Sequence, residues 1–264
     1  MKNWIKISLS LMVIVVYATM VSSSAKKKFV AVAPPPPTFK VPSYAYTPPA
    51  HASISGNDLK ILVVEPTYNS KFKYADYRIF TDFKKFMSGD INESLTTKGY
   101  LVRGPFETYE GAMYTDKTES DLLLNIELDL DLNDQNINWK GTEILVSGKK
   151  KTAVYTNIYK LDGYFTLSGK VNISISEPIT KEKIWVKNVP LKQRMIRIAS
   201  KNEYKTYRDY SLAFETEPIF ANPFIPALQD YYKEILDIAW ASLDPNELTT
   251  LKKYVKEIRE KKKY

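Results

Sequence analysis

The amino-acid sequence predicts an α+β fold: a mixed, mostly antiparallel sheet with an amino-terminal β-α-β crossover and two carboxyl-terminal helices packed on the sheet. Three patterns support this fold class. A strand, a long helix and a second strand are indicated within residues 59–105. Alternation with a period of two is present in residues 122–134 and 164–176, and helical periodicity extends over residues 228–263.

The crossover is predicted from residues 59–105. The run "LKILVVEP" is apolar and β-branched and stops at Pro66, which is typical of a buried strand. "YLVRGP" is the second short strand, and Gly99 precedes it where the left-handed carboxyl cap of a helix favours glycine. Strand, helix and strand together predict a right-handed crossover and a parallel pair. The helix between them has one apolar stripe, formed by Phe80, Phe83, Met87, Ile91 and Leu95.

The middle of the chain predicts antiparallel strands. In "LLLNIELDLDLND", apolar residues alternate with acidic ones, so one row belongs to the core and the other to the opposite face. "YFTLSGKVNISIS" alternates in the same way, and the turn "EPITKEK" leads into its expected hairpin partner "IWVKNV". Residues 192–220 mix tyrosines and charges without a stable period and predict no element.

Two helices are expected at the carboxyl end. The segment Asp244-Pro245-Asn246-Glu247 has the pattern of a capping box and starts the second helix, which ends in a run of basic residues that suits its negative end. The first helix has a broad apolar face, formed by Leu228, Tyr232, Ile235, Leu236, Ala239, Trp240 and Leu243.

The amino terminus has the order of a secretory signal. Basic residues in Met1–Lys6 precede the uncharged run Ile7–Val21, and the small residues Ser23-Ser24-Ala25 follow. Positive charge at Lys26–Lys28 opposes export of the run. Residues 1–25 are therefore a cleaved signal peptide or an uncleaved anchor. With either, we expect an extracytoplasmic protein, in the periplasm or associated with the outer membrane or cell surface.

Residues 26–53 contain seven prolines and no apolar periodicity, so we expect a proline-rich linker. Residues 54–264 are expected to form a single α+β domain, because they are long enough to bury one core and contain no internal repeat.

The composition excludes several kinds of chemistry. The chain contains no cysteine, which excludes disulfides, a cysteine nucleophile, a thiolate zinc site and a lipidated cysteine. Its one histidine, His51, lies in the predicted linker, so no histidine-based triad or metal site is expected in the domain. No glycine-rich phosphate loop is present. We therefore expect a protein that is not an enzyme and that uses no cofactor and no metal.

Three carboxylates lie on one face of the first long strand. Glu127, Asp129 and Asp131 are spaced by two residues, which favours an outward face opposed by lysines across the sheet. A calcium site and a pair of catalytic carboxylates are the alternatives.

Two groups of residues are candidates for binding. Lys149, Lys150 and Lys151 form a basic turn that suits an acidic sugar or a phosphate, and Trp139, ten residues earlier, suits stacking on a sugar ring. The basic carboxyl-terminal helix is a candidate contact for a membrane or cell wall. The net charge of +8 is concentrated in such runs, and nucleic acid is not an expected partner outside the cytoplasm.

The segments "ILVVEP", "KGYLV", "LLLNIELDL", "GYFTLSGKVNISISEPITKEKIW" and "NELTTLKKYVKEIREKKKY" occur in an order that resembles the neuraminyllactose-binding hemagglutinin family. The resemblance covers most of Leu59–Tyr264 and implies a bacterial cell-envelope protein related to outer-membrane lipoproteins and proposed adhesins. The chain departs from that family at two places. The lipidation cysteine is missing, and the basic segment expected after the acidic strand is replaced by Asn133-Asp134-Gln135-Asn136.

These observations predict an exported envelope interaction or scaffold module of bacteria that works by binding. The alternative, implied by the family resemblance, is a surface adhesin that binds sialic-acid glycans. The expected partner is accordingly an envelope protein or a glycan.

Overall fold

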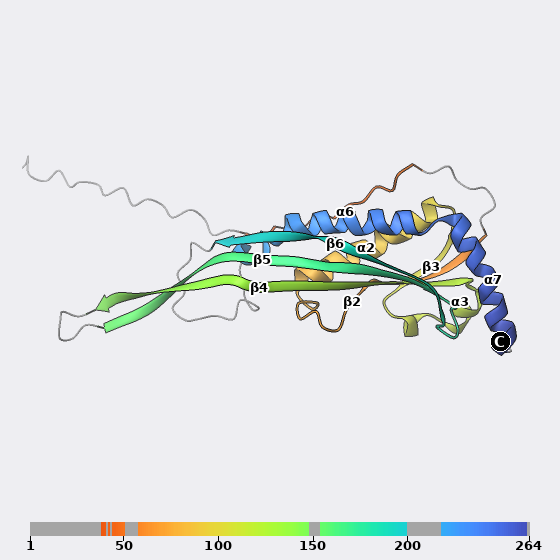
Figure 1. Ribbon diagram of the computed structural model, residues 1–264, viewed down its shortest axis with the longest axis horizontal. Helices are drawn as coiled ribbons and strands as arrows, with labels where there is room; N and C mark the ends of the chain where they lie inside the picture. The colour runs from red at the N-terminus through yellow and green to blue at the C-terminus, as the bar shows by residue number, and fades with distance from the viewer. Residues whose placement is uncertain are drawn as a thin grey trace, which may run out of the picture. The chain divides into compact units, whose positions relative to one another are not determined.

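A computed structural model describes residues 38–40, 42, 44–50, 58–147, 154–199 and 218–262 (Figure 1). The chain divides into the units Met1–Pro36 and Pro37–Tyr264, and the second unit contains every described element. The elements in chain order are β1 (Lys60–Val64), β2 (Thr67–Tyr68), α2 (Arg78–Thr97), β3 (Leu101–Phe106), η1 (Tyr109–Gly111), α3 (Tyr114–Glu119), β4 (Leu122–Ser147), β5 (Val154–Ser176), β6 (Lys183–Ala199), α5 (Pro218–Ala221), α6 (Phe224–Ser242) and α7 (Pro245–Lys262).

The described strands form one mixed sheet in the order β3-β1-β4-β5-β6, with β2 paired to β4. Strand β1 runs parallel to both β3 and β4, whereas β5 runs antiparallel to both β4 and β6. Because α2 connects the parallel pair β1 and β3, the predicted crossover is confirmed. The long antiparallel strands and the two carboxyl-terminal helices confirm the predicted α+β class.

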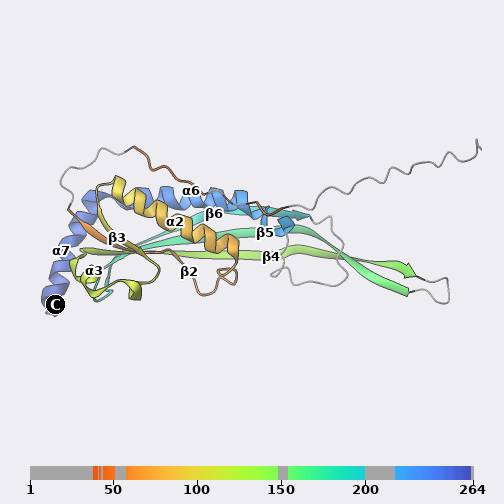
Figure 2. The same ribbon diagram turned by 180° about the vertical axis from the view of Figure 1, so that it is seen from behind.

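Helices α2 and α6 lie side by side on one face of the sheet (Figures 1 and 2). The predicted stripe of α2 is buried, and so are most of the predicted apolar positions of α6. On the other face, around the parallel strands, Leu62, Val64, Ala112 and Leu123 form a second small core. Along β4 and β5 that face belongs to the polar rows of the two strands.

Helix α2 ends as predicted. Gly99 has a φ of 85°, in the left-handed region that favours glycine. The Gly99 amide donates to the Thr96 carbonyl at 2.9 Å, and the Tyr100 amide donates to the Leu95 carbonyl at 3.1 Å. These two hydrogen bonds satisfy carbonyls of the last turn of α2, and the chain then continues into β3.

Strands β4 and β5 are longer than the sequence predicted, at 26 and 23 residues. The pairing register shifts between Asn133 and Asn136, so the period of two is interrupted there and the alternation loses its phase. Strand β6 also continues to Ala199, through residues in which no element was predicted. A second register shift, between Leu167 and Gly169 of β5, explains the lost period in β6.

Helix α7 begins at the predicted cap. One carboxylate oxygen of Asp244 accepts hydrogen bonds from the amides of Asn246 and Glu247, at 2.9 and 3.3 Å. The Glu247 carboxylate does not complete the expected box. It instead accepts a hydrogen bond of 2.7 Å from the Trp185 indole, which fastens the start of α7 to β6.

The far end of α7 is held by an ion pair. Glu177, in the turn between β5 and β6, has no exposed side-chain surface, and its carboxylate lies 2.8 Å from Nε of Arg259. The same carboxylate accepts hydrogen bonds from the backbone amides of Ile179 and Thr180. The Arg259 guanidinium also donates to the Ser120 carbonyl at 2.9 Å, so one side chain joins α7, the β5–β6 turn and the end of α3.

Arg259→Gln is expected to destabilise the protein by about 3 kcal/mol, because it leaves the buried Glu177 carboxylate without its cation. Denaturant unfolding measures the free energy. Lys256→Gln, at an exposed position on the same helix, is the matched control and is expected to have little effect. Equal stabilities of the two variants would contradict a stabilising role for the ion pair.

Residues 44–50 lie in the predicted linker, yet part of this segment is packed on the domain. The Tyr44 ring stacks on Tyr232 at 5.0 Å between centroids and meets Phe83 edge-on at 5.4 Å. The Tyr46 amide donates to Asp90 at 3.0 Å, and its hydroxyl donates to Asp237 at 3.2 Å. The composition of the segment hid these contacts, because two isolated tyrosines among prolines give no periodic signal.

Tyr46 gives this packing a pH dependence. Burial raises the pKa of Tyr46 to about 12, and the hydrogen bond to Asp237 adds to the shift. An unfolded tyrosine ionises near pH 10. The stability that Tyr46 contributes is therefore fully present below pH 10 and is lost as the pH rises towards 12.

Tyr46→Phe is expected to remove this contribution. Between about pH 9.5 and 11.5, the free energy of unfolding should fall less steeply in the variant than in the wild type. Urea midpoints at several pH values measure the slope. Tyr254→Phe, at an exposed tyrosine, should keep the wild-type slope. If Tyr46→Phe keeps it too, Tyr46 does not couple folding to pH.

Candidate functional site

The structure does not describe the predicted lysine turn. Lys149, Lys150 and Lys151 lie outside the described residues, so their binding role remains a prediction. Trp139 lies in β4, and its backbone pairs with Leu161 of β5. This pair is beyond the last residue of β5 that pairs with β6, which is Asp162, opposite Ala199.

The acidic row of β4 is engaged in structural contacts. Asp129 is directly opposite Lys170 of β5, and their charged atoms are 3.3 Å apart, as the cross-strand interpretation predicted. Glu127 accepts a hydrogen bond of 2.9 Å from the Asn69 amide, which follows β2. Within the described ranges, no three acidic or imidazole side chains group as a metal site requires.

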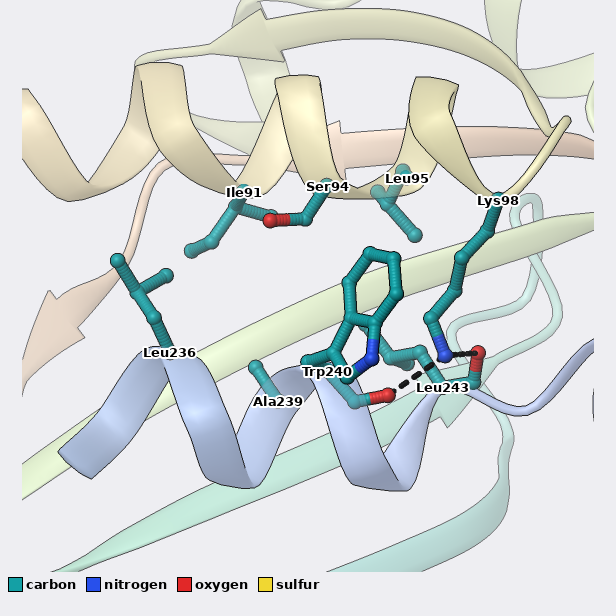
Figure 3. Close-up of a pocket in the computed structure, with 8 residues that line it drawn as sticks. All are labelled: Ile91, Ser94, Leu95, Lys98, Leu236, Ala239, Trp240 and Leu243. Carbon is teal, nitrogen blue, oxygen red and sulfur yellow. Dashed lines mark hydrogen bonds between the residues drawn. The ribbon is translucent and has the colours of Figure 1, made fainter. Parts of the chain in front are cut away.

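A small pocket lies where the carboxyl ends of α2 and α6 meet (Figure 3). The Lys98 ammonium enters it from the end of α2 and donates to the carbonyls of Trp240 and Leu243, at 2.6 and 3.0 Å. It also lies 4.4 Å from the centre of the Trp240 ring. Tyr100 donates a further hydrogen bond of 3.1 Å to the Leu243 carbonyl.

Lys98 acts as a carboxyl-terminal cap for α6. The last carbonyls of a helix have no partner within the helix and carry partial negative charge, so a cation is favourable there. Burial lowers the pKa of the Lys98 ammonium, and the nearby Asp244 carboxylate opposes that shift. The pocket has room for about 10 Å³, which is one water at most. The pocket is therefore part of the packing between α2 and α6, and it is too small to hold a ligand.

Lys98→Met is expected to lower the free energy of unfolding by about 1–3 kcal/mol, because it removes the ammonium that donates to the carbonyls of Trp240 and Leu243. Methionine keeps the length of the side chain, so the loss reports the hydrogen bonds and the charge. Thermal or urea unfolding measures it. Lys85→Met, at an exposed position on α2, is the control. A Lys98→Met variant as stable as the wild type would show that the ammonium gives no net stabilisation.

A much larger groove lies between α6 and β6, the last strand of the sheet. It has about 670 Å³ of open space. The lining combines an apolar part with both signs of charge. The residues are Val189, Pro190, Arg194, Asp230, Lys233, Glu234, Asp237, Ile238 and Ala241.

The charges of the groove form pairs. Arg194 lies 3.5 Å from Asp230 and 3.2 Å from Glu234, and Lys233 lies 2.7 Å from Asp237. The Asp230 and Lys233 side chains are 66% and 73% exposed. Exposed pairs of this kind contribute little to stability, so their members are free to exchange an internal partner for an external one.

The backbone of β6 is protected along this groove. Pro190 has no amide hydrogen to offer to a further strand, and the Lys192 amide donates to Glu234 at 2.9 Å. Strand addition is therefore blocked in this part of the sheet edge. A ligand in the groove has to be bound through the side chains of α6 and β6.

The sequence placed the acidic and basic residues of α6 on a polar stripe but did not identify the groove. The missing information is the pairing of Arg194 with residues about forty positions later. Arg194 belongs to the stretch in which no element was predicted. Helical periodicity shows which residues share a face, and it does not show which strand that face meets.

Comparison with protein-family models gives no match, and comparison with curated proteins gives none either. Among solved structures, a neuraminyllactose-binding hemagglutinin homolog from Helicobacter pylori has a TM-score of 0.46 and 17% identity, covering 78% of this chain and 97% of that chain. A DUF330 protein from Xanthomonas campestris has a TM-score of 0.37 and 12% identity, covering 81% and 99%.

A minor lipoprotein from Acinetobacter baumannii is more distant, with a TM-score of 0.24 and 11% identity over 69% of this chain and 93% of that chain. All of these TM-scores lie below 0.5, so the similarities carry no argument about family or function. Among the described residues, no helix has both the length and the hydropathy needed to cross a membrane.

Proposed function

We propose that this protein is an exported, non-catalytic interaction module of the bacterial cell envelope that binds a protein partner in the groove between α6 and β6. The groove is the observation that carries the proposal. It is a large, open hollow that is lined by both apolar and charged groups.

The lining favours a polypeptide over a sugar. Sugar rings are commonly held by stacking on aromatic side chains, and none of the described residues that line the groove is aromatic. Both signs of charge occur within it, and complementary charges are what orient one protein on another. The apolar part, which includes Val189 and Ile238, supplies surface that a partner can bury.

The amino-terminal sequence supports the location. Residues 1–25 are proposed to direct export, as a cleaved signal or as an anchor, and residues 26–53 to form a proline-rich connection whose last part is packed on the domain. The segment order of residues 59–264 supports a divergent member of the neuraminyllactose-binding hemagglutinin family that lacks the lipidation cysteine. The glycan-binding alternative depends on Lys149–Lys151 and Trp139.

The test compares capture of envelope proteins by the wild type and by Asp230→Lys. The substitution reverses a charge inside the groove and removes an exposed pair worth at most about 1 kcal/mol, so the fold is retained. Asp76→Lys makes the same change at an exposed position before α2. We expect one partner to be captured by the wild type and by Asp76→Lys, and to be reduced at least about tenfold by Asp230→Lys.

Equal capture of the partner by all three proteins would contradict binding in the groove. The glycan alternative has its own readout. A saturable calorimetric isotherm with sialyllactose that disappears when Lys149, Lys150 and Lys151 are changed to glutamine would favour the adhesin.

A further inference from the structure

The groove between α6 and β6 has a charged end and an apolar end. Helix α6 and strand β6 lie side by side and run in opposite directions (Figures 1 and 2). Arg194 of β6 pairs with Asp230 and Glu234 of α6, and this is the charged end. The apolar end comes from earlier residues of β6 and later residues of α6, which are Val189, Pro190, Ile238 and Ala241. A ligand that fills the groove therefore needs both a charged part and an apolar part.

The charged end keeps an excess of negative charge. The Arg194 guanidinium serves two carboxylates, at 3.5 Å from Asp230 and 3.2 Å from Glu234, so one negative charge is left over. Lys233 and Asp237, which lie 2.7 Å apart, neutralise each other. Among the described residues, Arg194 is the only cation paired with Asp230, whose side chain is 66% exposed. A cationic group of a ligand can therefore reach Asp230 without displacing Arg194.

The strand edge in the groove favours a helical ligand over an extended one. An extended peptide is normally held on a sheet edge by main-chain hydrogen bonds. Pro190 has no amide hydrogen, and both backbone groups of Lys192 are occupied. The Lys192 amide donates to Glu234 at 2.9 Å, and its carbonyl accepts from Arg194 at 3.0 Å. A helix satisfies its own backbone hydrogen bonds, so side chains alone are sufficient to bind it.

The groove side of α6 has the spacing of a helix-packing surface. Its residues recur at intervals of three and four positions: Asp230, Glu234, Asp237, Ile238 and Ala241. The stripe is roughly 17 Å long, or three turns of helix. A partner helix of similar length, aligned with α6, covers the groove from its charged end to its apolar end.

We infer that the partner presents an amphipathic helix with a lysine or arginine and a large apolar side chain on one face, about seven or eight residues apart. The inference rests on the proposed protein-binding function of the groove. Asp230 and Ile238 are about 12 Å apart along the axis of α6, which equals that spacing on an aligned helix. Side chains seven or eight positions apart share one helix face. The basic side chain meets Asp230, and the apolar one packs between Val189 and Ile238.

Selection from a library of displayed peptides tests the inference on the full chain, without the natural partner. The probes are alanine-rich peptides of about 18 residues, which is long enough for an isolated helix, with the positions of one face randomised. Counter-selection on Asp230→Lys discards peptides that bind elsewhere. We expect the enriched sequences to share a basic residue and a large apolar residue seven or eight positions apart.

A charge exchange then tests the contact at Asp230. Replacing the basic residue of an enriched peptide by glutamate should weaken its binding to the wild type at least about tenfold, because like charges then face each other. The same replacement should strengthen binding to Asp230→Lys by a similar factor. Fluorescence anisotropy of the labelled peptides measures both affinities. Asp76→Lys, at an exposed position before α2, should bind both peptides as the wild type does.

The apolar end has its own variant. Ala241→Gln places a polar group at an exposed position of that end and should weaken binding of the enriched peptide about tenfold. Thr250→Gln, at an exposed position of α7, is the matched control and should leave the affinity unchanged. Equal affinities of these two variants would contradict an apolar contact at this end.

Other results also overturn the inference. They are enrichment of peptides without the expected spacing, no enrichment over Asp230→Lys, and equal binding of the basic and glutamate peptides. A peptide that keeps its affinity when proline replaces a central residue is not bound as a helix. If capture of the envelope partner still depends on Asp230, the groove then binds another kind of segment. If neither capture nor any peptide depends on Asp230, the proposed function fails as well.

Discussion

The apolar face of the β4–β5–β6 sheet is the constraint on which the other parts of the domain depend. Phe165, Leu167, Val171, Ile173 and Ile175 occupy alternate positions of β5 and are all fully buried. Burying a side chain of this size stabilises a protein by about 1.5–3 kcal/mol, so this one row contributes more than any single polar contact in the domain. Helices α2 and α6 cover this apolar face. Tyr44 packs where the two helices meet, against Phe83 and Tyr232. Along β4 and β5 the opposite face carries alternating polar residues, and around the parallel strands it has a small core of its own.

Polar contacts fix the ends of the helices after the apolar face has placed them. Lys98 caps the end of α6, and Asp244 caps the start of α7 a few residues later. Arg259 then holds the other end of α7 through the buried Glu177. Lys98 and Arg259 have hydrogen-bonding partners on other elements, so their contacts also specify distances between elements. This explains why the corner between α6 and α7 combines a small pocket with dense hydrogen bonding.

Much of the fold could be predicted because its signals are local and periodic. The stripe of α2, the glycine cap and the start of α7 all follow from residues close in sequence. The missed parts each involve a broken period or a distant partner. The register shift after Asn133 hid the continuation of β4 and β5, another shift hid the end of β6, and the tyrosines at 44 and 46 have no periodic neighbours. The groove was missed for the second reason, since Arg194 meets its acidic partners only after β6 and α6 pack. Of the predicted binding residues, Trp139 is placed by its backbone pairing and the three lysines lie outside the described residues.

The packed segment at residues 44–50 has a mechanical consequence. A force that pulls on the amino-terminal chain acts first on the two hydrogen bonds of Asn222 with Thr38 and Lys40, then on the stacked Tyr44, and last on Tyr46. These contacts follow one another along the chain, so such a force loads them in that order and reaches β1 after them. Tension on the amino-terminal chain therefore acts on these side-chain contacts before it acts on the hydrogen bonds of the sheet.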